Sequence, residues 1–154
     1  MKNFQFTILQ FSICILVVVA GFLLINNDSY HSPSHIKYIK IAGQDIKVEL
    51  AITPAQQEQG LSGRNELKEN EGMLFAFPQP GKYYFWMKDM NFPIDMIWIG
   101  KDMRIIYIKK DARPESYPET YGPGKDAKYI LEVVSGFSEK NNLKEDNKVE
   151  FISN

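Results

Sequence analysis

The chain has 154 residues, a formal net charge of −1 and a charged fraction of 24%. This balance argues against a nucleic-acid-binding protein, which needs a basic surface to contact phosphates. The length favours one folded domain besides any targeting segment. Aromatic residues make up 13% of the chain, and together with frequent Ile, Val and Tyr they favour β structure.

The N-terminal segment carries the clearest local signal. Residues 6–25 contain no charge and follow Lys2. About 20 apolar residues, at ~1.5 Å per residue, cross the ~30 Å hydrocarbon core of a bilayer, so this segment predicts a transmembrane helix. Residues 26–28 contain no Lys or Arg. The positive-inside rule therefore places the rest of the chain outside the cytoplasm, in the periplasm or at the cell surface.

Three fates are open for this segment. It is a retained signal anchor, or a signal peptide cleaved after Val18-Val19-Ala20, in which case the protein is secreted. Lipidation at Cys14 is the third, although Ile13 before it fits a lipoprotein signal poorly. Cys14 is the only cysteine, so the exported part has no disulfide, no thiol nucleophile and no cysteine metal site.

The chain therefore divides into a signal anchor or signal peptide at 1–25, a polar tether at 26–35 and a folded domain at 36–154. Within the domain, alternating or continuous apolar runs predict strands. These runs are 36–42, 44–51, 72–77, 83–88, 94–99, 103–109, 128–134 and 148–152. Thr53 and Gln56 predict a capping box at the start of a short helix that ends at Gly60.

A second helical turn is expected at 136–142, and 111–126 is expected to be a long loop that is either mobile or functional. The fold class predicted is mainly β. We expect a compact β-sandwich or barrel of about seven or eight short strands with one or two short helices, behind an N-terminal transmembrane helix.

Several separate blocks of the domain match a known family in order and spacing. They are Glu49 to Ala51, Thr53 with Gly60-Leu61 and Arg64, Gly72 to Phe75, Phe85 to Lys88, Pro93 to Asp95, and Tyr129 to Glu132 with Gly136. Residues 37 to 152 thereby resemble domain-of-unknown-function family 192. The resemblance implies a compact, mainly β fold, often behind a signal or anchor, with no established activity. The closing Gly-Asp pair usual in the family is replaced here by Asp146-Asn147.

Two charges stand out in the apolar stretch 85–99. Asp95 shares a strand face with Ile97 and Ile99, so its charge must meet a cation or accept hydrogen bonds from backbone N–H groups. If strands 83–88 and 94–99 form a hairpin through 89–93, Lys88 lies close to Asp95. Arg64 and Glu132 would complete a polar cluster.

Two interpretations of this cluster remain open. In the structural one, Asp95 caps the 89–93 turn, and Arg64 and Glu132 form a bridge that fixes the fold. In the functional one, the cluster lines a pocket rimmed by Tyr84, Trp86 and the 111–126 loop. Aromatic walls with a few convergent polar groups suit a small polar ligand such as a sugar or peptide fragment.

Two further hypotheses concern chemistry. Asp95 and Glu132 would serve as acid and base in glycan hydrolysis, which needs two carboxylates at ~5–10 Å. Both histidines, His31 and His35, lie in the tether, so the domain lacks the commonest general base and metal ligand. The second hypothesis is thioether binding of Cu(I). It would use Met73, Met87, Met90 and Met96, although Met more often fills gaps in the core. We expect no cofactor and no bound metal.

Overall fold

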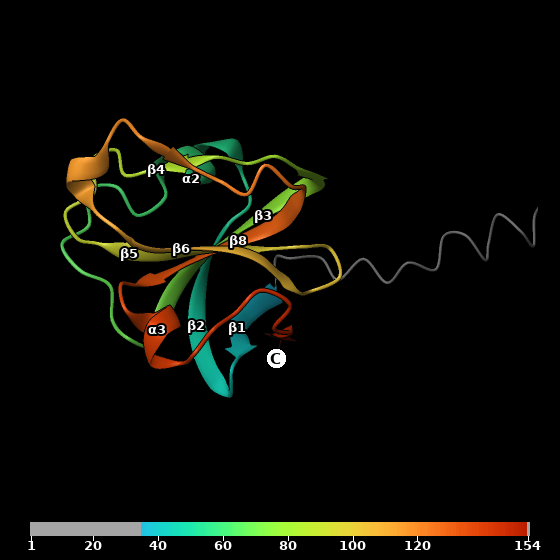
Figure 1. Ribbon diagram of the computed structural model, residues 1–154. Helices are drawn as coiled ribbons and strands as arrows, with labels where there is room; N and C mark the ends of the chain where they lie inside the picture. Colours follow the sequence, from blue (N-terminus) through green and yellow to red (C-terminus); the bar gives the residue numbers. More distant parts are fainter. Residues whose placement is uncertain (1–34, 154) are drawn as a thin grey trace, which may run out of the picture. The chain divides into compact units, whose positions relative to one another are not determined.

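The computed structural model describes residues 35–153 (Figure 1). Within this range, nine strands form a seven-stranded sheet in the order β6-β5-β8-β3-β2-β1-β9 and a two-stranded ribbon, β4-β7. The strands are β1 (Ile36–Ile41), β2 (Gln44–Ala51), β3 (Glu71–Gly81), β4 (Phe85–Trp86), β5 (Ile94–Ile99), β6 (Ile105–Ala112), β7 (Thr120–Tyr121), β8 (Ala127–Val134) and β9 (Val149–Ser153). The helices are α2 (Pro54–Gln59), α3 (Phe137–Lys140) and the 3₁₀-helix η2 (Pro114–Ser116).

The sheet is open but strongly curled. All neighbouring strands of the sheet pair antiparallel except β2 and β3, which run parallel and are connected through α2. One bridge, between Arg104 and Lys148, brings the β6 edge to the β9 edge. The prediction of a mainly β fold with one or two short helices is therefore confirmed. The sheet neither closes into a continuous barrel nor divides into the two comparable sheets of a sandwich.

Local signals in the sequence explain the first elements. In β2, Ile46 and Val48 are buried while Lys47 is exposed, as the alternation of apolar and polar residues predicts. The predicted capping box is present at α2: the Gln56 N–H donates to Thr53 Oγ1 over 3.3 Å, and the Thr53 N–H donates to Gln56 Oε1 over 3.0 Å. These contacts fix where α2 begins.

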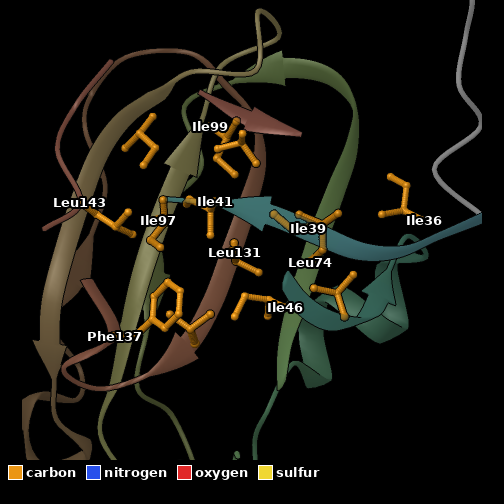
Figure 2. Close-up of a cluster of buried hydrophobic side chains, with 14 residues drawn as sticks. Ile36, Ile39, Ile41, Ile46, Leu74, Ile97, Ile99, Leu131, Phe137 and Leu143 are labelled. Atoms are coloured by element: carbon orange, nitrogen blue, oxygen red, sulfur yellow. The ribbon is translucent and has the colours of Figure 1, made fainter. Parts of the chain in front are cut away.

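The central strands carry apolar side chains on both faces. All six residues of β5 are buried, so this strand is covered on its two sides. One core cluster includes Ile97, Ile99 and Leu131 and packs them against side chains of β1 and β2 and against Phe137 of α3 (Figure 2). A second cluster, on the side of α2 and β4, includes Trp98. In Figure 1, β5, β6 and β8 separate α2 and β4 from α3.

The segment 83–126 differs from expectation. The strand predicted at 83–88 is reduced to the two residues of β4, which pair with β7 through Phe85–Tyr121 and Trp86–Thr120. The expected hairpin between 83–88 and 94–99 is therefore wrong. The long loop at 111–126 holds η2 and β7, and it supplies the partner that β4 was expected to find in β5.

No helix within residues 35–153 is long and apolar enough to cross a membrane. The predicted membrane segment at 6–25 and residues 26–34 of the tether lie outside the described residues. Their roles therefore stay predictions.

Candidate functional site

A pocket of about 90 Å³ lies between α2, the turn that follows it, and β4. A single water needs roughly 10–15 Å³, so the pocket accommodates several waters or one functional group of a larger ligand. Its wall on the helix side is mostly polar, and its wall on the β4 side is aromatic. The lining residues are Gln57, Glu58, Gln59, Gly60, Leu61, Ser62, Phe75, Tyr84, Phe85, Trp86, Met90 and Glu132.

The polar wall follows from the composition of α2. The helix has the sequence PAQQEQ and buries none of its residues, so it has no apolar face to place on the core. Side-chain hydrogen bonds hold it instead. Gln57 Nε2 donates to the carbonyls of Ala51 and Ala76 over 3.3 and 3.1 Å. In the following turn, Ser62 Oγ donates to the Lys88 carbonyl over 2.8 Å and ties this wall to the aromatic one.

The aromatic wall consists of three consecutive rings around β4. Phe85 is half-buried and packs edge-on against Phe75, with ring centroids 4.8 Å apart. Tyr84 and Trp86 project outward and are 55% and 50% exposed. Trp86 also contacts Tyr117, in the loop after η2, edge-on at 5.8 Å. The rim therefore presents large ring faces to solvent beside a polar pocket.

Glu132 forms the buried end of the pocket. It lies at the centre of β8, opposite Met73 of β3 and Met96 of β5, and its side chain faces the second core cluster. The residue is only 4% exposed, and its Oε2 has no hydrogen-bond partner. Burial raises the pKa of Glu132 from its usual 4.5 to about 8, while the charge of Arg64 opposes the shift. The carboxyl is therefore mostly protonated and neutral at pH 7.

Arg64 lies near this carboxyl but is paired elsewhere. Its Nη1 and Nη2 donate to the two carboxylate oxygens of Glu49 on β2, over 2.6 and 2.7 Å. These hydrogen bonds lower the pKa of Glu49 and raise that of Arg64. Among residues 35–153 no ion pair joins Arg64 to Glu132, so the predicted bridge between them does not form.

Asp95 belongs to a different part of the molecule. It pairs with Val133 on β8, whereas Glu132 pairs with Met96, so the two carboxyl groups project from opposite faces of the sheet. Asp95 is fully buried, and its oxygens accept backbone N–H bonds. The donors are Asp111 at 2.9 Å, Gly136 at 3.3 Å and Ser138 at 2.8 Å.

The sequence pattern of the DUF192 family, described as "Uncharacterized ACR", matches residues 37–151. The chain belongs to this family. None of the curated proteins matches it.

Two solved structures resemble the DUF192 domain closely. A protein of unknown function from Novosphingobium aromaticivorans DSM 12444 is 31% identical with a TM-score of 0.71, over 75% of this chain and 84% of that one. A protein from Sinorhizobium meliloti 1021, described as a "putative transcription regulator", is 31% identical with a TM-score of 0.69. That match covers 74% of this chain and 90% of the other. These relatives establish the fold and leave the ligand open.

Within residues 35–153 the predicted pair between Lys88 and Asp95 does not form. Asp95 takes its hydrogen bonds from backbone N–H groups, one of the two expected solutions, but at the end of β6 and the start of α3 instead of the 89–93 turn. Lys88 is exposed, with its Nζ 6.0 Å from the ring centroid of Trp86. The charges of 85–99 thus serve separate purposes.

The structure does not bring together the residues that glycan hydrolysis or Cu(I) binding would need. Because Asp95 and Glu132 lie on opposite faces of the sheet, they do not form the carboxylate pair that glycoside hydrolysis needs. Met87 and Met96 are buried in the core, and Met90 is the one methionine of the described residues in the pocket lining. Within residues 35–153 no three His, Cys, Asp or Glu side chains are grouped to hold a metal ion.

Three of the six predicted site residues meet at the pocket: Tyr84, Trp86 and Glu132. The 111–126 loop, expected at the rim, touches Trp86 through Tyr117 but does not line the pocket. Sequence reasoning missed the α2 wall. The polar composition of this helix, which has no apolar residue beyond Pro54 and Ala55, indicated an exposed element, but no local pattern placed it beside β4.

Proposed function

We propose that the domain binds a small polar ligand, a sugar or peptide fragment, in the pocket between α2 and β4. The observation that supports this most is the Glu132 carboxyl, which is buried at the pocket with its Oε2 unpaired. A buried polar group without a partner costs about 1–3 kcal/mol. A ligand group that hydrogen-bonds to Glu132 would recover this free energy.

The dimensions of the pocket define how such a ligand sits. About 90 Å³ holds one functional group, while the rest of the ligand lies outside against the exposed rings of Tyr84 and Trp86. Aromatic faces beside a few convergent polar groups are typical of sites for small ligands. The ligand is thus anchored by one polar group and held by apolar contact along its remainder.

The cellular setting of this binding module is proposed from the sequence. Residues 6–25 would tether the domain to a membrane, with the domain outside the cytoplasm. The Sinorhizobium relative is described as a "putative transcription regulator", but a net charge of −1 gives this chain no basic excess for binding nucleic acid.

Replacing Trp86 with Ala is expected to weaken ligand binding at least tenfold, about 1.4 kcal/mol or more, because half-buried aromatic anchors dominate small interfaces. The measurement is a thermal-shift screen of sugars and short peptides on the full-length chain in detergent, followed by titration of each hit. Because Trp86 is half exposed, its loss leaves the melting temperature of the unliganded protein nearly unchanged.

Tyr38→Ala is the matched control for this substitution. Tyr38 is a half-buried aromatic residue on β1 and is absent from the pocket lining. Ligands should bind this variant with wild-type affinity. A hit that binds Trp86→Ala and wild type equally well lies elsewhere on the protein, and a screen with only such hits contradicts the proposal.

A retained signal anchor at residues 1–25 predicts where the protein is found after cell fractionation. The full-length chain should remain in the membrane pellet after an alkaline carbonate wash, while protease added to spheroplasts or to whole cells digests the domain. Removing residues 2–25 should leave the domain in the cytoplasm and protected from that protease. Recovery of the full-length chain in the carbonate supernatant would contradict a retained anchor and favour cleavage.

A further inference from the structure

The charged side chains that line the pocket are all acidic. Its lining contains two carboxyl groups, Glu58 from the exposed face of α2 and Glu132 at the buried end, and no Lys, Arg or His. Three aromatic rings, those of Tyr84, Phe85 and Trp86, complete the opposite wall. Carboxylates and ring faces share one preference, because both attract a cation.

The basic side chains near the pocket do not place a cation inside it. Arg64, whose charge acts on Glu132 through space, directs Nη1 and Nη2 to the two oxygens of Glu49 and is absent from the lining. Lys88 is exposed and also outside the lining, with its Nζ 6.0 Å from the Trp86 ring centroid. This contact shows that the Trp86 ring is accessible to an ammonium group. An anionic ligand, by contrast, would meet two carboxyl groups and no basic partner in the lining.

We propose that the group bound in the pocket is an ammonium cation, with Glu132 as its counter-ion and the aromatic wall against its remaining faces. This inference rests on the proposed ligand-binding function and specifies the ligand class within it. The amine of a peptide and that of an amino sugar share this chemistry. An ammonium group would give Glu132 Oε2, which is buried without a hydrogen-bond partner, the donor that it lacks.

Binding then requires the transfer of one proton. The neutral Glu132 carboxyl releases its proton to solvent, its Oε2 becomes a carboxylate oxygen, and an ammonium N–H of the ligand donates to it. The ligand keeps its own charge, so one proton leaves for each ligand bound to protonated protein. Because burial holds the pKa of Glu132 at about 8, this release is nearly complete at pH 7.

Few other charges face Glu132. Its neighbours on β3 and β5 are Met73 and Met96, which are uncharged. From the other elements, Arg64 acts on it through space while paired with Glu49, and Glu58 lines the same pocket from α2. Affinity for an amine should therefore follow the ionisation of Glu132. For an amine whose own pKa lies well above 8, such as that of lysine, it should rise about tenfold per pH unit below about pH 8 and level off above it.

Calorimetric titration of the full-length chain in detergent tests this with two matched pairs of compounds. Glucosamine is compared with glucose, and Nα-acetyl-lysine amide, which keeps its side-chain ammonium, with Nα-acetyl-norleucine amide. In at least one pair the amine should bind at least tenfold more tightly than its neutral partner. For the lysine amine, which stays protonated over this range, the affinity should rise about tenfold between about pH 6.5 and about pH 7.5. The amine of glucosamine loses its own proton near neutral pH, so its affinity should rise less over the same interval. Titrations in buffers of different ionisation enthalpy should show release of about one proton. The pair that responds identifies the source as a sugar or a peptide.

Three variants separate the contributions. Glu132→Gln should abolish both the preference for the amine and its pH dependence. Glu58→Gln, on an exposed helix position that leaves the fold intact, should weaken amine binding two- to threefold, while the exposed Glu115→Gln on η2 should have no effect.

Equal affinity for amine and neutral partner, or binding without proton release, would overturn the ammonium inference while leaving the proposed pocket function in place. Failure of all four compounds to bind overturns the inference as well. The proposed function itself fails only if the wider screen yields no ligand whose binding depends on Trp86.

Discussion

Replacing Asp95 with Ala is expected to lower the free energy of unfolding by about 3–5 kcal/mol. The carboxylate is fully buried and accepts three backbone N–H bonds, from Asp111, Gly136 and Ser138. Alanine leaves these three donors without a partner and opens a small cavity. Urea unfolding of the full-length protein, followed by tryptophan fluorescence, measures the loss.

The position of Asp95 explains why one residue contributes so much to the free energy of unfolding. It connects the end of β6, through Asp111, to the turn between β8 and α3, through Gly136, and to α3 itself, through Ser138. Ser135 in that turn also donates to the Asp111 carboxylate over 2.8 Å. Without Asp95, α3 should loosen first, and amide hydrogen exchange should quicken at α3 before it quickens in the central strands.

Two comparison variants define the cause of the loss. Asp95→Asn keeps one acceptor oxygen but turns an NH₂ group toward a backbone donor, so its loss should be smaller than that of Asp95→Ala. Asp45→Ala removes an exposed carboxylate from β2 and should change stability by no more than about 0.5 kcal/mol. If Asp95→Ala lost no more than Asp45→Ala, the three N–H bonds would contribute little to the fold.

The features predicted correctly from the sequence depend on near neighbours. The alternation of Ile46, Lys47 and Val48 defines a strand with one buried face, and Thr53 with Gln56 defines the start of α2. The same alternation placed Asp95 beside Ile97 on a shielded face, and the structure confirms its burial. Each of these patterns spans only a few residues, so local physics decides it.

The features predicted wrongly depend on distant partners. Lys88 and Asp95 are close in sequence, and a hairpin between their strands would have paired them. Instead β4 pairs with β7, more than thirty residues later, and β5 pairs with β6 and β8. The choice between these partners is decided by the whole sheet, because β5 has two apolar faces to bury and only a central position covers both.

The pocket shows both cases together. The position of Glu132 in the apolar run of β8 indicates a buried carboxyl. Tyr84 and Trp86 were expected as rings at a pocket rim, so sequence reasoning found these three residues. The same reasoning wrongly placed Asp95 in the same cluster, although Asp95 lies on the opposite face of the sheet from Glu132. The polar wall of α2 comes to the pocket only through the parallel crossover between β2 and β3, a connection that no local pattern specifies.

The Glu132 carboxyl gives the protein a stability that depends on pH. The unfolded chain loses this proton near pH 4.5, whereas the folded protein keeps it until about pH 8. Stability from this group is therefore complete below about pH 4.5 and is lost as the pH rises toward 8. The loss is about 1.4 kcal/mol per pH unit and on the order of 3–5 kcal/mol in total.

Glu132→Gln should remove this loss, because the amide has nearly the same shape and does not ionise. At about pH 4.5 and below, the variant and wild type should unfold with free energies within about 1 kcal/mol of each other, and above about pH 8 the variant should be the more stable by several kcal/mol. Urea unfolding at intervals from about pH 4 to about pH 9 measures the difference. Subtracting the two profiles cancels other groups such as Glu49. The pKa of Glu49 is lowered by Arg64, so its contribution is lost at acid pH instead.

Glu115→Gln, at an exposed position on η2, is the control and should keep the wild-type profile. Parallel profiles for Glu132→Gln and wild type would mean that the carboxyl ionises as freely in the folded protein as in the unfolded chain. A variant that is more stable than wild type only at high pH would instead show that this buried carboxyl is costly to the empty protein. Such a cost is expected of a group retained for a ligand, because a side chain that served the fold alone would be more stable as an apolar residue.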